Sequence, residues 1–178
     1  MQTETVIAGF GGQGALFTGK VIAYTAMDKG LKVTWFPSYG PEMRGGTANC
    51  TVIFSDEEIG SPLILNPKSA IVMNQPSLDK YEPLVQKDGY LVINSSVINR
   101  QVQRHDIKII SIPGTEVAES LGNKRIANII LLGGLIANSG FFLLEEVEKS
   151  LTKILTGKKK DLLELNIQML HKGATFKV

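Results

Sequence analysis

TVIAGFGGQG, residues 5–14, is the stretch that decides the fold of this chain. Its first six residues form a β-rich run, and Gly9, Gly11 and Gly14 then give the pattern GxGxxG. Residues 15–29 follow with apolar side chains at helical spacing, so the glycines lie between a strand and a helix. In that context a GxGxxG pattern indicates a Rossmann-like βα unit.

The same turn is a candidate site for a ligand. Amides at the start of a helix, where the helix dipole is positive, can hold a phosphate or a pyrophosphate. The residues available for such a site are Gly9, Gly11, Gly12, Gln13 and Gly14. A dinucleotide site would also need Asp or Glu at the end of the second strand, where Phe36, Pro37 and Ser38 stand instead. A dinucleotide, another phosphate or carboxylate group, and a tight turn without a ligand all stay open.

Beyond this turn, strand and helix patterns alternate along the chain. Strands are expected at residues 5–10, 32–36, 48–54, 70–74, 90–94 and 107–112. Helices are expected at residues 15–29, 76–85, 116–121, 126–139, 144–155 and 161–172. The alternation predicts an α/β fold, with a mostly parallel sheet covered on both faces in one three-layer α/β/α domain over residues 1–178. The last helix, with its wide apolar face, packs on this domain or on a partner.

The composition excludes several classes of function. Nineteen basic and seventeen acidic residues leave a formal charge of +2, so we expect no nucleic-acid partner. The single cysteine, Cys50, cannot hold an iron–sulfur cluster, which needs about four thiolates. The apolar stretch 126–137 is shorter than the roughly 20 residues that span a bilayer. The chain also starts without a signal-like segment, so we expect no membrane contact and a cytoplasmic location.

No set of catalytic side chains is evident. His105 and His171 lie in charged, surface-like segments, and Cys50 lies within a strand pattern with no base nearby. Thr18, Gly19 and Lys20 fall inside the first helix, so they do not form a Walker motif. We therefore predict no catalytic residue and no metal ligand in this chain.

A loop and several asparagines carry the remaining site hypotheses. Pro37 is expected to end the second strand, and the loop from residue 37 to 47 then presents Tyr39, Glu42 and Arg44 outward. These three suit a subunit contact, although Glu42 and Arg44 equally suit a local salt bridge. Asn74 follows a strand, where its amide could bind a ligand or a partner, or satisfy the amides of its own turn.

A further asparagine, Asn128, lies inside an apolar helix and needs a hydrogen-bond partner if it is buried. The turn at Gly114 and Thr115 is expected to supply that partner.

Together these segments carry a family resemblance. GFGGQG at 9–14, PSYGPEMRGG at 37–46, the sequence NQP at 74–76, and the positions from Gly114 to Asn128 occur in this order. The chain resembles, over nearly its whole length, the gamma subunit of pyruvate and 2-oxoacid:ferredoxin oxidoreductases.

The resemblance implies a multi-subunit complex that oxidatively decarboxylates a 2-oxoacid to an acyl-CoA and reduces ferredoxin. Alpha and beta subunits would carry thiamine diphosphate and magnesium, and a ferredoxin-like delta subunit would belong to the same complex. The iron–sulfur clusters also lie on partner subunits, and coenzyme A is a co-substrate. This chain would be inactive alone, with Tyr39, Glu42, Arg44 and Asn74 at a subunit contact or along the coenzyme A path.

Pyruvate, 2-oxoglutarate, a branched-chain acid such as ketoisovalerate, and indolepyruvate all fit the resemblance as substrates. From the residues alone, the alternatives are a self-sufficient nucleotide-binding Rossmann-type oxidoreductase or regulator, and a protein-binding module without redox chemistry.

Overall fold

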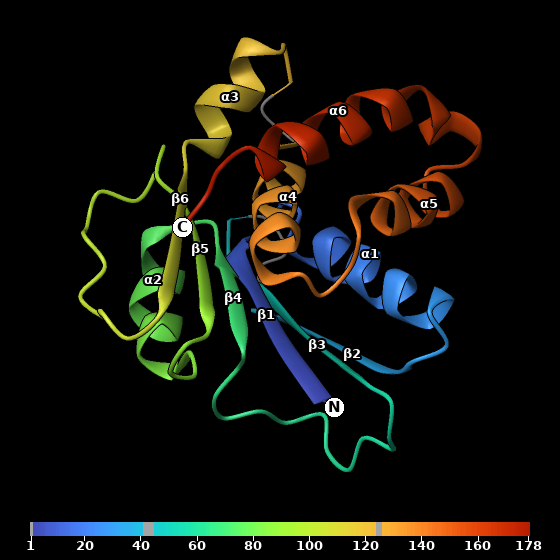
Figure 1. The fold of residues 1–178 in the computed structure, drawn as a ribbon. Coiled ribbons are helices and arrows are strands. Elements are labelled where there is room, and N and C mark those ends of the chain that lie inside the picture. Colours follow the sequence, from blue (N-terminus) through green and yellow to red (C-terminus); the bar gives the residue numbers. More distant parts are fainter. Residues whose placement is uncertain (1, 41–44, 124–125) are drawn as a thin grey trace.

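A computed structural model describes residues 2–40, 45–123 and 126–178 and contains a six-stranded sheet in the order β2-β3-β1-β4-β5-β6 (Figure 1). The strands are β1 Gln2–Phe10, β2 Lys32–Tyr39, β3 Thr47–Ser55, β4 Ser69–Val72, β5 Tyr90–Asn94 and β6 Lys108–Ile112. β4, β5 and β6 run parallel to β1, whereas β3 is antiparallel to both β1 and β2. Within this sheet only β3 therefore opposes the common direction.

Helices cover both faces of the sheet (Figure 1). One face carries α1 Ala15–Asp28, α4 Ala127–Ser139, α5 Leu144–Ile154 and α6 Leu163–Ala174. The other carries α2 Gln75–Tyr81 and the 3-10 helix η1 Glu82–Leu84. A short helix, α3 Gly114–Ser120, follows β6, and the 3-10 helix η3 Gly157–Leu162 precedes α6. The arrangement confirms the predicted α/β/α layers around a mostly parallel sheet.

The alternation of side chains along β1 explains why this strand is central. Ile7 packs into the core beneath α1 and α4, whereas Val6 and Ala8 pack into the smaller core beneath α2. All three are at most 4% exposed. Because fully burying an aliphatic side chain is worth roughly 1.5–3 kcal/mol, such a two-sided apolar strand is stable only between two layers of helices.

The prediction that Pro37 ends the second strand is wrong. β2 continues to Tyr39, and Pro37 pairs with Cys50 of β3 in the register. The amide of Gly40 donates to the carbonyl of Thr47, so by the alternation of an antiparallel pair Pro37 directs its nitrogen away from β3. β2 is also the edge of the sheet, where a missing N–H costs no ladder bond.

Two helix boundaries also differ from expectation. The helix predicted over residues 76–85 is α2 followed by η1, because Pro83 has no N–H for the bond to the carbonyl of Asp79. The helix predicted over residues 161–172 is the end of η3 followed by α6, which packs across α4. Among the described residues, no helix combines the length and apolar character needed to cross a bilayer.

Candidate functional site

The glycine turn, residues 9–14, lies at the carboxyl end of the central strand β1. Its neighbours in the sheet, β3 and β4, lie on opposite sides of β1, and open α/β sheets place ligand sites at such points. Gly12 has φ of 99° and Gly14 has φ of 87°, a left-handed conformation that favours glycine. The sequence therefore needs glycine at both positions to bring the chain from β1 into α1.

The side chain of Gln13 holds the turn in shape. Its Oε1 accepts from the amide of Phe10 at 2.6 Å and from Nδ2 of Asn74 at 3.4 Å. Its Nε2 donates to the carbonyl of Met73 at 3.1 Å, just after β4. A Cβ at Gly9 would lie 2.6 Å from Gln13 Oε1, so Gly9 provides the space for this bond. Of the predicted ligand-binding residues, Gln13 is thus committed to tying β1 to β4.

Asn128 of α4 anchors the start of α1. Its Nδ2 donates to the carbonyl of Gly14 at 3.3 Å and to Oγ1 of Thr18 at 3.0 Å. The prediction that Gly114 and Thr115 supply the partner of Asn128 is wrong. Thr115 instead bonds with Asn94 in both directions, through its amide and its Oγ1.

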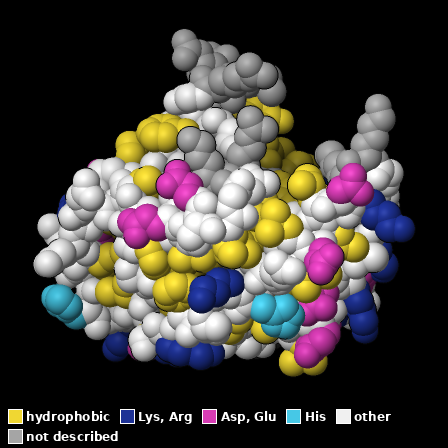
Figure 2. Space-filling model, turned by 90° about the horizontal axis from the view of Figure 1, so that it is seen from above, with side chains coloured by type: hydrophobic (Ala, Val, Ile, Leu, Met, Phe, Trp, Pro, Cys, Tyr) yellow, Lys and Arg dark blue, Asp and Glu magenta, His cyan; other side chains and the backbone are white. Residues whose placement is uncertain are grey.

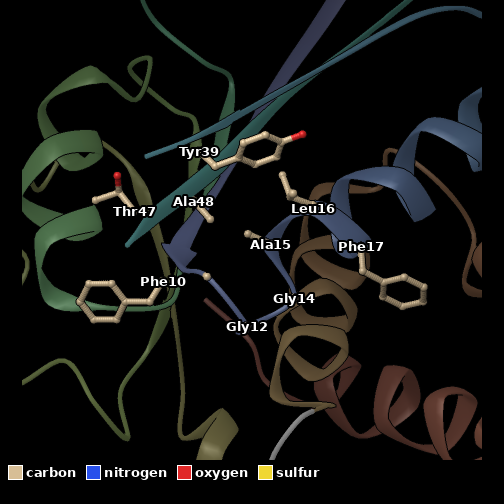
Figure 3. Close-up of a pocket in the computed structure, with 10 residues that line it drawn as sticks. Phe10, Gly12, Gly14, Ala15, Leu16, Phe17, Tyr39, Thr47 and Ala48 are labelled. Atoms are coloured by element: carbon tan, nitrogen blue, oxygen red, sulfur yellow. The ribbon is translucent and has the colours of Figure 1, made fainter. Parts of the chain in front are cut away.

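A first cavity of about 380 Å³ opens beside the turn, between α1, β2 and β3 (Figure 3). Tyr39 of β2 and Leu16 of α1 lie on facing sides of it (Figure 3). The described lining residues are Phe10, Gly11, Gly12, Gly14, Ala15, Leu16, Phe17, Tyr39, Thr47 and Ala48. None of them is charged. The backbone amides that begin α1, which lack partners within the helix, are the polar groups positioned for an anion.

The predicted loop residues fall at the rim of this first cavity or outside the described chain. Tyr39 is 54% exposed and lines the cavity. Glu42 and Arg44 lie outside the described residues. On either side of them, the Gly40 amide donates to the Thr47 carbonyl at 2.9 Å, and the Gly11 amide donates to the Gly46 carbonyl at 2.8 Å.

Asn74 is 4% exposed, and both ends of its amide are occupied. Its Oδ1 accepts from the Ser77 amide at 2.9 Å and so caps α2, while its Nδ2 donates to Gln13. The structure therefore places Asn74 behind the glycine turn, in the position of a turn-capping residue. Its role on the path of coenzyme A stays a prediction.

A second cavity of about 250 Å³ lies on the other side of Gly12, at the carboxyl ends of β1, β4 and β5. Asn94, Thr115 and Asn128 line it together with Gln13. Asn94 is an asparagine at the end of β5, which is a local signal, but no local pattern in the sequence links it to Asn128. Figure 2 shows the molecule from this carboxyl-end side, where hydrophobic side chains form several exposed groups separated by charged ones.

The chemically reactive side chains are engaged elsewhere. Cys50 is fully buried, its Sγ donates to the carbonyl of Ala15 at 3.4 Å, and burial raises the pKa of its thiol to about 12. His171 Nε2 forms a hydrogen bond of 2.6 Å with Glu148 Oε1, between α6 and α5. Within the described ranges no three His, Cys, Asp or Glu residues converge in a way that would hold a metal ion.

The described geometry thus places the glycine turn between two cavities, and comparison with known proteins assigns the chain to a family. Residues 4–176 match the family described as Pyruvate ferredoxin/flavodoxin oxidoreductase. Ketoisovalerate oxidoreductase subunit VorA of Methanothermobacter thermautotrophicus is 35% identical over 97% of this chain, which spans only 36% of VorA. 2-Oxoglutarate synthase subunit KorC of Methanocaldococcus jannaschii is 30% identical over 97% of this chain and 92% of KorC.

Solved structures share the fold. The gamma subunit of a keto/oxoacid ferredoxin oxidoreductase from Geobacter sulfurreducens has a TM-score of 0.82 at 26% identity, over 97% of this chain and 96% of that subunit. A 2-oxoglutarate:ferredoxin oxidoreductase from Magnetococcus marinus, with 2-oxoglutarate, coenzyme A and succinyl-CoA bound, has a TM-score of 0.85. At 20% identity over 30% of that longer chain, this second likeness concerns the fold alone. The resemblance found in the sequence is confirmed, and the chain belongs to the Pyruvate ferredoxin/flavodoxin oxidoreductase family.

Proposed function

We propose that this chain is the gamma-type subunit of a 2-oxoacid:ferredoxin oxidoreductase and has no activity without its partners. The observation that carries the proposal is the family match over residues 4–176, combined with a glycine turn that opens onto a cavity. Relatives named as subunits of ketoisovalerate and 2-oxoglutarate enzymes support it. The described residues bring no base, nucleophile or metal ligand to this turn, which is consistent with chemistry located on other chains.

In this proposal the complex converts a 2-oxoacid and coenzyme A into an acyl-CoA and passes electrons to ferredoxin. Alpha and beta subunits hold thiamine diphosphate and magnesium, and a ferredoxin-like delta subunit belongs to the same assembly. The iron–sulfur clusters lie on these partner subunits. The assembly is cytoplasmic, as the sequence led us to expect.

The contribution of this chain would be to bind and orient coenzyme A at its border with the partners. The amides at the start of α1 suit a phosphate, and the first cavity offers aromatic rings from Phe17 and Tyr39 beside them. Tyr39, Glu42 and Arg44 would then belong to the subunit contact or to the coenzyme A path.

The arrangement of the sheet argues against the self-sufficient dinucleotide enzyme. In a dinucleotide-binding unit the second strand lies beside the first and ends in an acidic residue that binds the ribose. Here β3 lies between β1 and β2, and β2 ends with Pro37, Ser38 and Tyr39. Neither the order of the strands nor the residues at the end of β2 match a dinucleotide-binding unit.

Affinity purification of the tagged chain from the organism that encodes it tests the proposal. We expect it to be recovered with chains that bind thiamine diphosphate and iron–sulfur clusters, identified by mass spectrometry and by cofactor analysis. Recovery of the chain in a stable complex that lacks both cofactors would contradict the proposal.

A further inference from the structure

The strand β2 forms an open edge of the sheet. The order of the strands ends at β2, and among the described strands none pairs with its outer side. The Gly40 amide donates to the Thr47 carbonyl, so by the alternation of an antiparallel pair the even-numbered residues of β2 bond to β3. The backbone N–H and C=O groups of Val33 and Trp35 therefore point away from the sheet, where they can bond to another strand.

The side chains of this edge are uncharged where a second strand would lie. Edge strands are commonly protected from pairing by charged side chains, yet residues 33–36 carry no charge. Trp35, which is 39% exposed, lies on the face of α1, because a Cβ at Gly19 would lie 3.1 Å from its Nε1. Phe36 is 48% exposed on the opposite face, where α2 lies beside β4 and away from β2 (Figure 1). The edge is thus suited to pairing with an extended segment.

Pro37 restricts how such a segment can pair if it is the β2 of a second copy. In an antiparallel pair centred on Thr34, Val33 of each copy faces Trp35 of the other, and all the outward backbone groups of both residues are paired. If the pair were centred on Trp35, Pro37 would face Val33 of the other copy and, having no N–H, would leave that carbonyl unpaired. A centre at Phe36 would do the same to the carbonyl of Trp35. The register centred on Thr34 therefore satisfies the edge best.

The same register brings complementary side chains together on the exposed face. Lys32 of each copy would lie directly opposite Phe36 of the other, close enough for the ammonium to lie over the ring. Lys32 also forms an ion pair with Glu58 at 3.0 Å, so the edge carries charges of both signs and two copies do not repel each other. Because the backbone groups and the side chains of β2 each find a complement in a second β2, the edge fits another copy of this chain better than an unrelated strand.

We infer that two copies of this chain associate through β2, antiparallel and centred on Thr34, to form one continuous sheet. A twofold pair uses the same edge of both copies, so the assembly closes at a dimer, and β6 at the opposite edge takes no part. The inference goes beyond the proposed function: if the chain is a subunit, its complex contains an even number of copies. Its tests need neither cofactors nor partner subunits, so its failure leaves the proposed function standing.

Disulfide cross-linking of the full chain tests the register. In the inferred dimer, Thr34 of the two copies forms a non-hydrogen-bonded pair with Cα atoms about 4.5 Å apart, within the range of a disulfide. We expect Thr34→Cys to give a covalent dimer under mild oxidation, whereas Ser38→Cys, about 27 Å from its counterpart at about 3.4 Å per residue, should not. The native Cys50 is fully buried and does not compete. Cross-linking of Ser38→Cys as readily as Thr34→Cys, or of neither, would overturn the inference.

Charge variants test the association without a new covalent bond. Light scattering of the wild-type chain at about 100 µM should give the mass of two chains, since a Kd of about 1 µM leaves few monomers at that concentration. Phe36→Lys, which places like charges opposite each other, should weaken the dimer about tenfold, and adding Lys32→Glu to the same chain should restore most of the affinity.

Ser111→Lys is the matched control, because it adds the same charge at an exposed position of β6, the other edge of the sheet. It should leave the dimer unchanged. A wild-type chain with the mass of a monomer, or a Phe36→Lys chain that Lys32→Glu does not rescue, would contradict the inferred pairing.

Discussion

Gly14 is the residue at which backbone conformation and side-chain packing meet in this fold. It has φ of 87°, and a Cβ built there would lie 2.6 Å from Asn128 Nδ2. The same Asn128 nitrogen bonds to the Gly14 carbonyl. Any side chain at position 14 therefore strains the turn and pushes α4 away from the start of α1.

Gly14→Ala should destabilise the chain more than Gly30→Ala does. Gly30 also has a positive φ, of 75°, but nothing lies within 4 Å of a Cβ there, so its substitution reports backbone strain alone. We expect a cost of about 1–2 kcal/mol for Gly30→Ala and a further cost of about 1–3 kcal/mol for Gly14→Ala. Unfolding in urea measures both, and equal costs would contradict the close Gly14–Asn128 contact.

Glu82 is a buried carboxylate that fastens the connection between β5 and β6. It is 4% exposed, and its Oε2 accepts from Arg100 at 2.6 Å, while its Oε1 accepts from the amides of Gln103 and Arg104. Burial acts to raise the pKa of Glu82, but the hydrogen bonds from Arg100 and from these two amides hold it below its ordinary value of 4.5. The ionised form is therefore the one that stabilises the fold.

Glu82→Gln should destabilise the chain at pH 7, by about 1–3 kcal/mol, because the charge-assisted bonds are lost. The folded-state pKa is depressed, so this contribution is present above pH 4.5 and is lost as the pH falls through the folded value. The stability gap between wild type and variant should narrow below pH 4.5. Urea unfolding at several pH values measures it, with Glu57→Gln at an exposed position as control. A gap that does not change with pH would contradict this account.

At the scale of elements, two glycines determine how closely α6 lies on α4. A Cβ at Gly133 of α4 would meet the Leu170 carbonyl, and a Cβ at Gly173 of α6 would meet the Ile130 carbonyl. Glycine inside a helix costs up to about 1 kcal/mol relative to alanine. The close contact between the two backbones offsets this cost here. Leu170, itself fully buried, fills the core beneath this crossing.

Gly133→Ala should therefore destabilise the chain even though alanine favours helix. We expect a net loss of about 1–3 kcal/mol from overpacking, measured by thermal or urea unfolding. Gly60→Ala is the control, since a Cβ there meets nothing within 4 Å and the backbone has no positive φ. A stabilised Gly133→Ala variant would show that the helices can separate without cost.

The sequence was informative about elements where burial imposes a simple pattern. All six strands were predicted within a few residues. Four of them have a clear pattern, because β4 and β5 are buried on both faces and β1 and β3 are nearly so. Pro37 misled the prediction because proline ends a central strand but not an edge strand, and the sequence does not state which strand lies at the edge.

At the scale of the whole molecule, the features that the sequence did not predict depend on contacts between residues far apart in the chain. Asn128 lies 114 residues from its partner Gly14, and the local turn at Gly114 and Thr115 was the nearer candidate. The insertion of β3 between β1 and β2 was likewise not evident, since a strand pattern carries no record of its neighbours. The glycine turn and the exposed Tyr39 were found because their signals are local, whereas the second cavity forms only when four distant segments meet.

Tyr39 tests whether the first cavity faces a partner or the coenzyme A path. It is 54% exposed, so Tyr39→Ala should change the stability of the isolated chain by less than about 0.5 kcal/mol. In the assembled complex we expect subunit affinity or the KM for coenzyme A to worsen about tenfold, the effect of a moderate interface residue. Tyr24→Ala, at a 37% exposed tyrosine of α1, is the matched control and should affect neither.

The central claim is that this chain contributes binding surface to an oxidoreductase and no complete active site. The measurement that tests it most directly is reduction of a viologen dye that depends on both a 2-oxoacid and coenzyme A. The assay compares the purified chain alone, the partner subunits alone and the two combined. The account predicts no turnover by the chain alone and full turnover only in the combination; robust turnover by the chain alone would contradict it.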